Sequence, residues 1–140
     1  MKSFAPFGRM ARSWKNNTLK HREMGIVTKQ IHAYLDYPVA LALMALPFLL
    51  GLGTSNPFAL QLSVGTGIAA FILTLLTDHQ LGLYRIVPYK GHLIVDALVG
   101  IVFVAAPFVF SFEGMDAYYY WINGGAVLTV VSLHKPEVAV

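Results

Sequence analysis

A long stretch without charged side chains restricts what this chain can fold into. Residues 37–77, between Asp36 and Asp78, contain no Asp, Glu, Lys or Arg. A transmembrane helix needs about 20 apolar residues, so the stretch fits two crossings better than one. Gly51 and Pro57 interrupt it near its middle, where a turn is expected. A buried helix pair in a soluble protein is the alternative, and it is disfavoured because these helices lack polar faces.

Part of this stretch belongs to a motif that occurs twice. His32 is followed four residues later by Asp36, and the same order recurs 60 positions along the chain at His92 and Asp96. In both copies a Pro-Phe pair follows the aspartate after ten intervening residues. We assign these four residues a structural role in the motif: Pro47, Phe48, Pro107 and Phe108. The repetition indicates a duplicated helical hairpin.

The expected fold class is therefore all-α, a bundle of four transmembrane helices made of two parallel hairpin repeats and preceded by a basic N-terminal tail. The four segments are a cytoplasmic tail at 1–29, a first hairpin at 30–77, a cytoplasmic connection at 78–91 and a second hairpin at 92–140. Helices are expected at about 31–50, 58–77 and 92–112, with a fourth ending at about 134. Small residues four apart, such as Ser63 and Gly67, predict close packing of the helices.

The ten Lys and Arg residues set the orientation. All of them lie in the tail, in the connection or after residue 134. The positive-inside rule then predicts that both termini and the connection are cytoplasmic. Within the tail, Phe4, Phe7 and Trp14 are spaced as one helical face. The tail is therefore either an amphipathic helix on an anionic membrane surface or a disordered basic segment.

The two His/Asp pairs are the candidate polar intramembrane site. At 100° per residue, His32 and Asp36 share one face of a helix with Pro47, and the second copy repeats that face. Lipid cannot satisfy a carboxylate, so the face should point into the bundle. Parallel repeats are related by an axis along the membrane normal, so both pairs should lie at one depth, near the cytoplasmic end. Pro38 is expected either inside the first helix or, if Asp36 is the N-cap, in its first turn. The second copy has no proline there, so the two helices can start differently.

Three interpretations of His32, Asp36, His92 and Asp96 are open at this point. The leading one is structural, with each aspartate holding a histidine or capping backbone. The second is a proton or ion site formed across the axis, and a divalent metal held by two histidines and two aspartates belongs with it. The third is axial ligation of a haem between helices. The chain has no cysteine, which excludes disulfides and thiolate chemistry.

The order of motifs carries a resemblance over about residues 31–134. It comprises His-x-x-x-Asp, Pro plus an aromatic residue, the linking motif Thr77-Asp78-His79-Gln80-Leu81-Gly82, and then the first order again. This order resembles the SPW-repeat family of small bacterial integral membrane proteins. Leu46-Pro47-Phe48 and Ala106-Pro107-Phe108 stand where the family has Ser-Pro-Trp, which is typical of a divergent member.

The resemblance implies a multi-pass protein of the bacterial inner membrane without an established reaction, so no catalytic residue is carried over. From the sequence we therefore expect a non-enzymatic, structural or accessory membrane protein that uses no cofactor. Its expected partners are the lipid bilayer and either a second copy or another membrane protein, and nucleic acid is not among them. The alternative is a carrier or sensor that uses the two His/Asp pairs.

Overall fold

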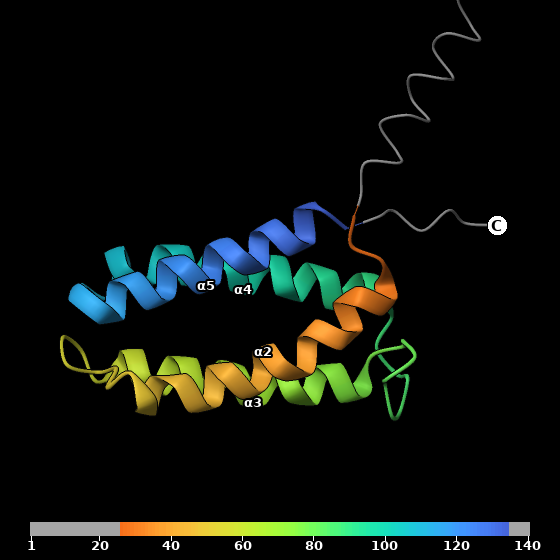
Figure 1. Ribbon diagram of the computed structural model, residues 1–140, viewed down its shortest axis with the longest axis horizontal. Helices are drawn as coiled ribbons and strands as arrows, with labels where there is room; N and C mark the ends of the chain where they lie inside the picture. The colour runs from red at the N-terminus through yellow and green to blue at the C-terminus, as the bar shows by residue number, and fades with distance from the viewer. Residues whose placement is uncertain (1–25, 135–140) are drawn as a thin grey trace, which may run out of the picture.

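The structure, a computed structural model, describes residues 26–134. It contains α2 (Lys29–Leu49), α3 (Phe58–Leu76), α4 (Tyr89–Val109) and α5 (Gly114–Ser132). Over these residues the chain is all-α, as the sequence predicts, and Figure 1 shows the four helices side by side. The tail up to residue 25 lies outside the described residues, so both interpretations of it stay predictions.

The four helices form two antiparallel hairpins. Helix α2 packs along α3, and α4 packs along α5, whereas the two hairpins contact each other much less. Figure 1 shows the connection 77–88 at the end of the bundle where α2 begins and α5 ends. At that end the N–H of Val27 donates to the carbonyl of Leu133 at 3.0 Å. The shorter connections, 50–57 and 110–113, lie together at the opposite end, which we call the loop end.

Three of the described helices are long and apolar enough to cross a membrane. They are α2, α3 and α4. Helix α5 has the same length as α3, 19 residues, but its sequence includes Asp116, three tyrosines and Asn123. It is not among the described helices that are apolar enough to cross a membrane by length and composition, although it packs along α4 as α3 packs along α2.

The first helix begins before Asp36, the residue considered as its N-cap. Thr28 is its N-cap, and the Thr28 hydroxyl accepts a hydrogen bond from the N–H of Ile31 at 3.2 Å. Asp36 is therefore not an N-cap, and Pro38 lies inside α2 rather than in its first turn. Helices α2 and α4 begin at equivalent motif positions, Lys29 and Tyr89, so Pro38 does not make their starts differ.

A second proline explains a link between the hairpins. Pro47 has no N–H, so the carbonyl of Leu43 lacks its usual donor within the helix. The Ser63 hydroxyl donates to that carbonyl at 2.9 Å, and the Tyr119 hydroxyl lies 2.7 Å from the Ser63 oxygen. Because Ser63 uses its single proton on Leu43, Tyr119 must donate to Ser63. This chain of hydrogen bonds joins α5 to α3 and α2.

Two glycines allow the helices of each hairpin to approach closely. A Cβ at Gly67 would lie 2.9 Å from the Ala40 carbonyl oxygen, and one at Gly124 would lie 2.9 Å from that of Gly100. Ala40 and Gly100 are 60 positions apart, so the same contact is built in both hairpins. It agrees with the close packing that small residues predict in membrane helices.

The loop end is closed by a buried acid. Asp116 lies in the first turn of α5 and is fully buried. Its carboxylate accepts hydrogen bonds from the N–H of Gly53 at 2.8 Å and from the N–H and hydroxyl of Ser55 at 2.9 and 2.5 Å. Tyr120 and Phe103 pack below it as part of the apolar core. The two hairpins are thus fastened firmly at this end.

Candidate functional site

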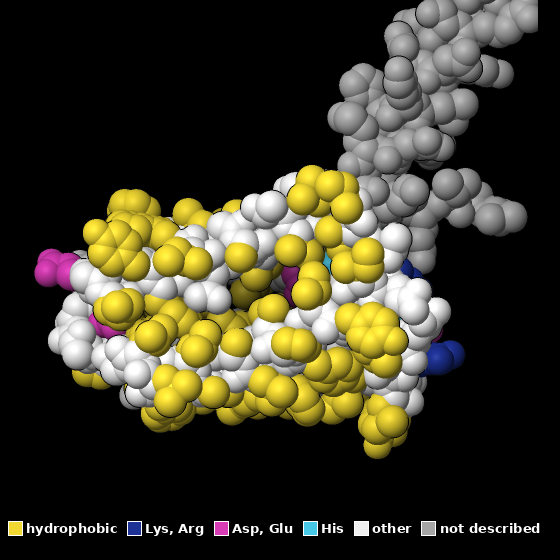
Figure 2. Space-filling view, viewed as in Figure 1, with side chains coloured by type: hydrophobic (Ala, Val, Ile, Leu, Met, Phe, Trp, Pro, Cys, Tyr) yellow, Lys and Arg dark blue, Asp and Glu magenta, His cyan; other side chains and the backbone are white. Residues whose placement is uncertain are grey.

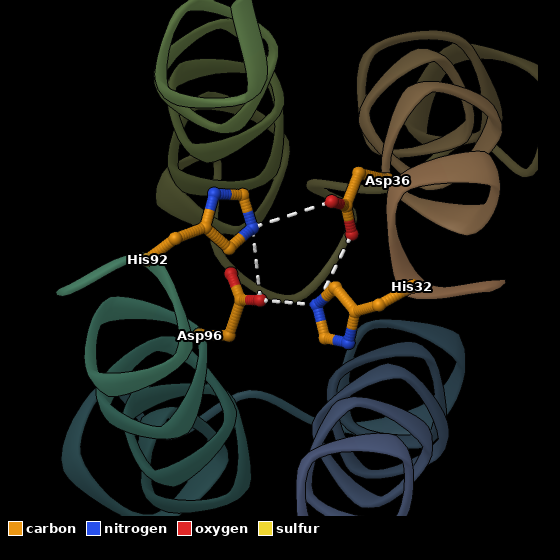
Figure 3. Close-up of side chains that lie close together, drawn as sticks. All are labelled: His32, Asp36, His92 and Asp96. Atoms are coloured by element: carbon orange, nitrogen blue, oxygen red, sulfur yellow. Dashed lines mark hydrogen bonds and ion pairs between the residues drawn. The ribbon is translucent and has the colours of Figure 1, made fainter. Parts of the chain in front are cut away.

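The two His/Asp pairs meet on the axis of the bundle, at the end opposite Asp116. His32 and Asp36 come from α2, and His92 and Asp96 come from α4. Figure 3 shows that α2 and α4 stand at opposite corners of the bundle and that the four side chains point toward one another between them. We call these four residues the His/Asp cluster, and the end of the bundle that holds them the cluster end.

Each histidine contacts both carboxylates. The Nε2 atom of His32 lies 2.8 Å from an oxygen of Asp96 and 3.2 Å from one of Asp36. The Nε2 atom of His92 lies 3.1 Å from the same Asp96 oxygen and 3.4 Å from the second oxygen of Asp36. The contacts across the axis are therefore as close as those within each motif, and the two pairs form one closed ring (Figure 3).

Burial differs between the two kinds of side chain. The side chains of His32 and His92 are 4% and 2% exposed, whereas those of Asp36 and Asp96 are 11% and 20% exposed. The carboxylates therefore provide most of the polar surface that the cluster presents. Such groups are costly in the interior of a membrane protein unless a counter-charge accompanies them.

The orientation of His92 is fixed by a residue outside the motif. The Thr77 hydroxyl lies 2.8 Å from Nδ1 of His92 and donates to the Leu73 carbonyl at 2.6 Å. Since that hydroxyl has one proton and the carbonyl can only accept, Nδ1 of His92 must carry the hydrogen and donate to Thr77. The other nitrogen, Nε2, is then the atom available to the cluster. Outer contacts of this kind orient metal-binding histidines.

The second histidine has different surroundings. An isolated β-bridge joins Thr77 to Val87. Val27, which is equivalent to Val87 in the 60-residue repeat, forms the corresponding β-bridge with His134. His134 thus takes the place beside His32 that Thr77 takes beside His92, with ring centroids 6.0 Å apart. Nδ1 of His32 is buried without a hydrogen-bond partner among the described residues. The two halves of the cluster are therefore not equivalent.

His79 packs near the cluster from the connection between the hairpins. His79 is buried, and its ring centroid is 6.3 Å from that of His92. Nδ1 of His79 accepts a hydrogen bond from the N–H of Leu81 at 3.1 Å. Burial lowers the pKa of His79, and the positive charges of His92, Lys29 and His32 lower it further. The neutral form is thus favoured in the folded protein.

Sequence reasoning gave no role to Thr77, His79 or His134. All three lie at the cluster end, because Thr77 follows α3, His79 follows Thr77, and His134 follows α5. Thr77 and His79 lie at the start of the linking motif, and their place in that motif was the one sequence signal that could have pointed to them. The Pro-Phe pairs lie away from the cluster, at the ends of α2 and α4, where each proline is buried and each phenylalanine is exposed.

The cluster matches the requirements of a metal site. Among the described residues, one ligand atom from each of His32, Asp36, His92 and Asp96 can be chosen so that all four lie within 4.8 Å of one another. The haem interpretation is not favoured, because an Asp96 oxygen lies within 3.1 Å of both Nε2 atoms. That oxygen takes the place that an axially ligated iron needs between two histidines.

A protein-family model described as the SPW repeat domain matches residues 30–135. The chain belongs to the SPW repeat family. The match includes both hairpins and the whole His/Asp cluster of this SPW repeat protein. No curated protein and no solved structure matches the chain. Membership and the three apolar helices together make it a multi-pass membrane protein.

Proposed function

We propose that this SPW repeat protein binds a divalent transition-metal ion of the Zn²⁺ class in the His/Asp cluster. The observation that carries the proposal is the ring of four nitrogen–oxygen distances, which run from 2.8 to 3.4 Å. Zinc bonds of 2.0–2.2 Å to nitrogen and oxygen place tetrahedral ligands about 3.3 Å from one another. The four nitrogen–oxygen contacts therefore lie near the spacing that a bound ion imposes, and all four ligand atoms lie within 4.8 Å of one another.

The charges of the cluster support the same proposal. With both histidines neutral, Asp36 and Asp96 leave two negative charges on the axis of an apolar bundle. A divalent ion neutralises them, and the Nε2 lone pairs supply two further ligands. Two protons, one on each histidine, also neutralise the two carboxylates. Binding of the metal ion therefore displaces these protons.

A weakly paired carboxylate oxygen favours a binding site over a purely structural network. Oδ2 of Asp36 is buried and makes no hydrogen bond with the described residues, and its contact with Nε2 of His92 is 3.4 Å long. An unsatisfied buried polar atom costs about 1–3 kcal/mol, so a network that served only to pack the helices is expected to satisfy it. A bound cation supplies the missing partner of Asp36.

The distribution of charge supports an orientation. Figure 2 shows Lys and Arg side chains at the cluster end and acidic side chains at the loop end. The positive-inside rule then places the cluster near the cytoplasmic surface, with both termini in the cytoplasm and four crossings of the bilayer. Family membership, as the sequence resemblance implies it, favours the bacterial inner membrane as the location.

Calorimetry with Zn²⁺ on the purified full-length protein tests the proposal. We expect one ion per chain, together with proton release that depends on the buffer. Asp36→Asn with Asp96→Asn removes both anionic ligands with little change of shape and should abolish binding. Asp78→Asn, a carboxylate outside the cluster, is the matched control. Equal binding by the double variant and the wild type would contradict the proposal.

Flux measurements then separate two roles for the bound ion. In proteoliposomes, a carrier moves Zn²⁺ into the lumen and loses that flux with the double Asn variant. A sensor binds the ion equally well and moves none. If the double variant loses thermal stability while the wild type neither binds nor moves Zn²⁺, the structural role is correct instead.

A further inference from the structure

A cavity of about 510 Å³ extends from the His/Asp cluster into the bundle. We call it the chamber. All four helices line it, and the apolar lining includes Val39, Leu43, Ala70, Val99 and Ala126. Its volume falls within the 300–1,000 Å³ that is common for small-molecule sites, which combine an apolar wall with a few polar groups.

The fold holds the chamber open. At the loop end, the hydrogen bonds that Ser55 donates to Asp116 fix the distance between the hairpins. At the other end, the ring of His/Asp contacts joins α2 to α4. Between these two fastenings the walls carry small side chains, such as Ala70 and Ala126, which do not reach across the gap. The hairpins therefore cannot collapse onto each other without breaking one of the fastenings.

The chamber opens on the side of the bundle. Figure 2 shows the face between α5 and α2 hollowed, with acidic and histidine side chains visible inside the hollow. Hydrophobic side chains surround this opening, as they cover the rest of that face. Because the flanking helix α2 is apolar enough to cross a membrane, the opening faces the acyl chains of the bilayer. Because most of the lining is apolar and the opening faces the membrane, we expect the occupant to come from the membrane.

The polar end of the chamber selects the head group of that occupant. Asp36 and Asp96 line the chamber and are more exposed than the two histidines, whose side chains are 4% and 2% exposed. Ionised carboxylates can only accept hydrogen bonds. A head group placed against them must therefore be a donor or carry positive charge.

We propose that the chamber binds a lipid-soluble organic cation, with its apolar body between the hairpins and its positive head against Asp36 and Asp96. The proposal rests on the cation site described above, because it uses the same two carboxylates. An organic cation and a metal ion are thus mutually exclusive occupants. The organic cation enters through the opening between α2 and α5.

The test uses radiolabelled tetraphenylphosphonium as the probe, in equilibrium dialysis against the purified full-length protein. We expect one probe molecule per chain and displacement of the probe by Zn²⁺. Ala126→Phe fills the chamber and should abolish binding, whereas Ala45→Phe, at an exposed position of α2 outside the chamber, should leave it unchanged. Ala70→Phe repeats the test from the opposite wall. Asp96→Asn should weaken binding at least about tenfold.

Each contrary result has a definite meaning. Binding that survives both Ala126→Phe and Ala70→Phe in folded protein overturns the chamber as the site. Binding that is lost with these variants but unchanged by Asp96→Asn overturns the cationic head group. If Zn²⁺ binds and the probe does not, this inference fails and the metal site stands. If neither binds, both proposals fail.

Discussion

Thr77 fixes which nitrogen of His92 faces the cluster. Its hydroxyl oxygen lies 2.8 Å from Nδ1 of His92, and its single proton is committed to the Leu73 carbonyl. The hydrogen of the imidazole is thereby held on the side away from Asp36 and Asp96. A metal ion or a second proton is then the partner that Nε2 requires. One threonine at the end of α3 therefore prepares a ligand that belongs to the other hairpin.

Replacing Thr77 by Val should weaken metal binding without removing a ligand. The variant keeps the shape of the side chain but leaves Nδ1 of His92 without an acceptor, and loss of such a contact lowers affinity by about 10–100-fold. Competition against a zinc chelator gives the affinity. Thr77→Ser should restore it. Thr129→Val, which removes an exposed hydroxyl bonded to Gly125, is the control. Equal losses in both Val variants would contradict the role of Thr77.

The two aspartates should not contribute equally. Asp96 lies 2.8 and 3.1 Å from the two Nε2 atoms, and Asp36 lies 3.2 and 3.4 Å from them. Asp96→Asn should therefore reduce Zn²⁺ affinity more than Asp36→Asn, and by more than the roughly 100-fold of an outer contact. Chelator competition on the two single variants measures the order. The reverse order would show that the bound ion does not use the ring of contacts described here.

The glycines of the second hairpin predict opposite effects at adjacent positions. A Cβ at Gly124 would meet the Gly100 carbonyl oxygen at 2.9 Å, whereas one at Gly125 meets nothing within 4 Å. Gly124→Ala should destabilise by about 1–3 kcal/mol through overpacking. Gly125→Ala should be neutral or stabilise by up to about 1 kcal/mol, because alanine is the better helix former. Thermal unfolding in detergent compares the two, and equal melting temperatures would count against this packing.

Asp116→Asn should loosen the loop end and leave the cluster intact. The amide group of Asn places donors toward the N–H groups of Gly53 and Ser55, which now bond to a carboxylate. Hydrogen bonds to charged groups contribute about 1.5–3 kcal/mol each, so the melting temperature should fall clearly. Glu113→Gln, an exposed neighbour, should change little. A loss of Zn²⁺ binding in Asp116→Asn at temperatures where it is folded would show that the two ends are coupled.

His79 predicts how stability depends on pH. Burial lowers its pKa below the ordinary 6.5, so the unfolded chain binds a proton more readily than the folded one. The contribution of His79 to stability is full above about pH 6.5 and declines as pH falls below that value. His79→Asn keeps an acceptor for Leu81 and cannot titrate. Its melting temperature should therefore fall less than that of the wild type between pH 7.5 and 5.5, and an identical fall would refute the assignment.

The architecture could be predicted because two physical constraints appear directly in the sequence. The stretch 37–77 has no charge, so it must cross the bilayer, and the spacing of 60 residues repeats the hairpin. The inward direction of Asp36 and Asp96 follows from the cost of a carboxylate in lipid. Local composition and periodicity alone therefore predict the helices and the direction of their polar faces.

The residues that contact the cluster from α3 and α5 could not be predicted, because the repeat does not keep one spacing. Equivalent positions are 60 residues apart in α2 and α4 but not in α3 and α5. Equivalent positions in α3 and α5, such as Gly67 and Gly124 or Thr77 and His134, are 57 residues apart. A period of 60 therefore fails to align Thr77 with its counterpart. The burial of Asp116 was equally hidden, because its donors come from the loop of the other hairpin. The chamber depends on side-chain volumes across four helices, which no linear pattern reveals.

X-ray absorption at the zinc edge, on the protein loaded with one equivalent of Zn²⁺, tests whether the two motifs form one metal site. We predict four nitrogen or oxygen ligands at about 2.0–2.1 Å, with the outer-shell scattering of two imidazole rings. That imidazole signal should disappear in His32→Ala with His92→Ala, while the wild-type spectrum stays unchanged in Asp78→Asn. A spectrum of the wild type with no imidazole scattering, typical of hydrated zinc, would contradict the claim that the two motifs form one site.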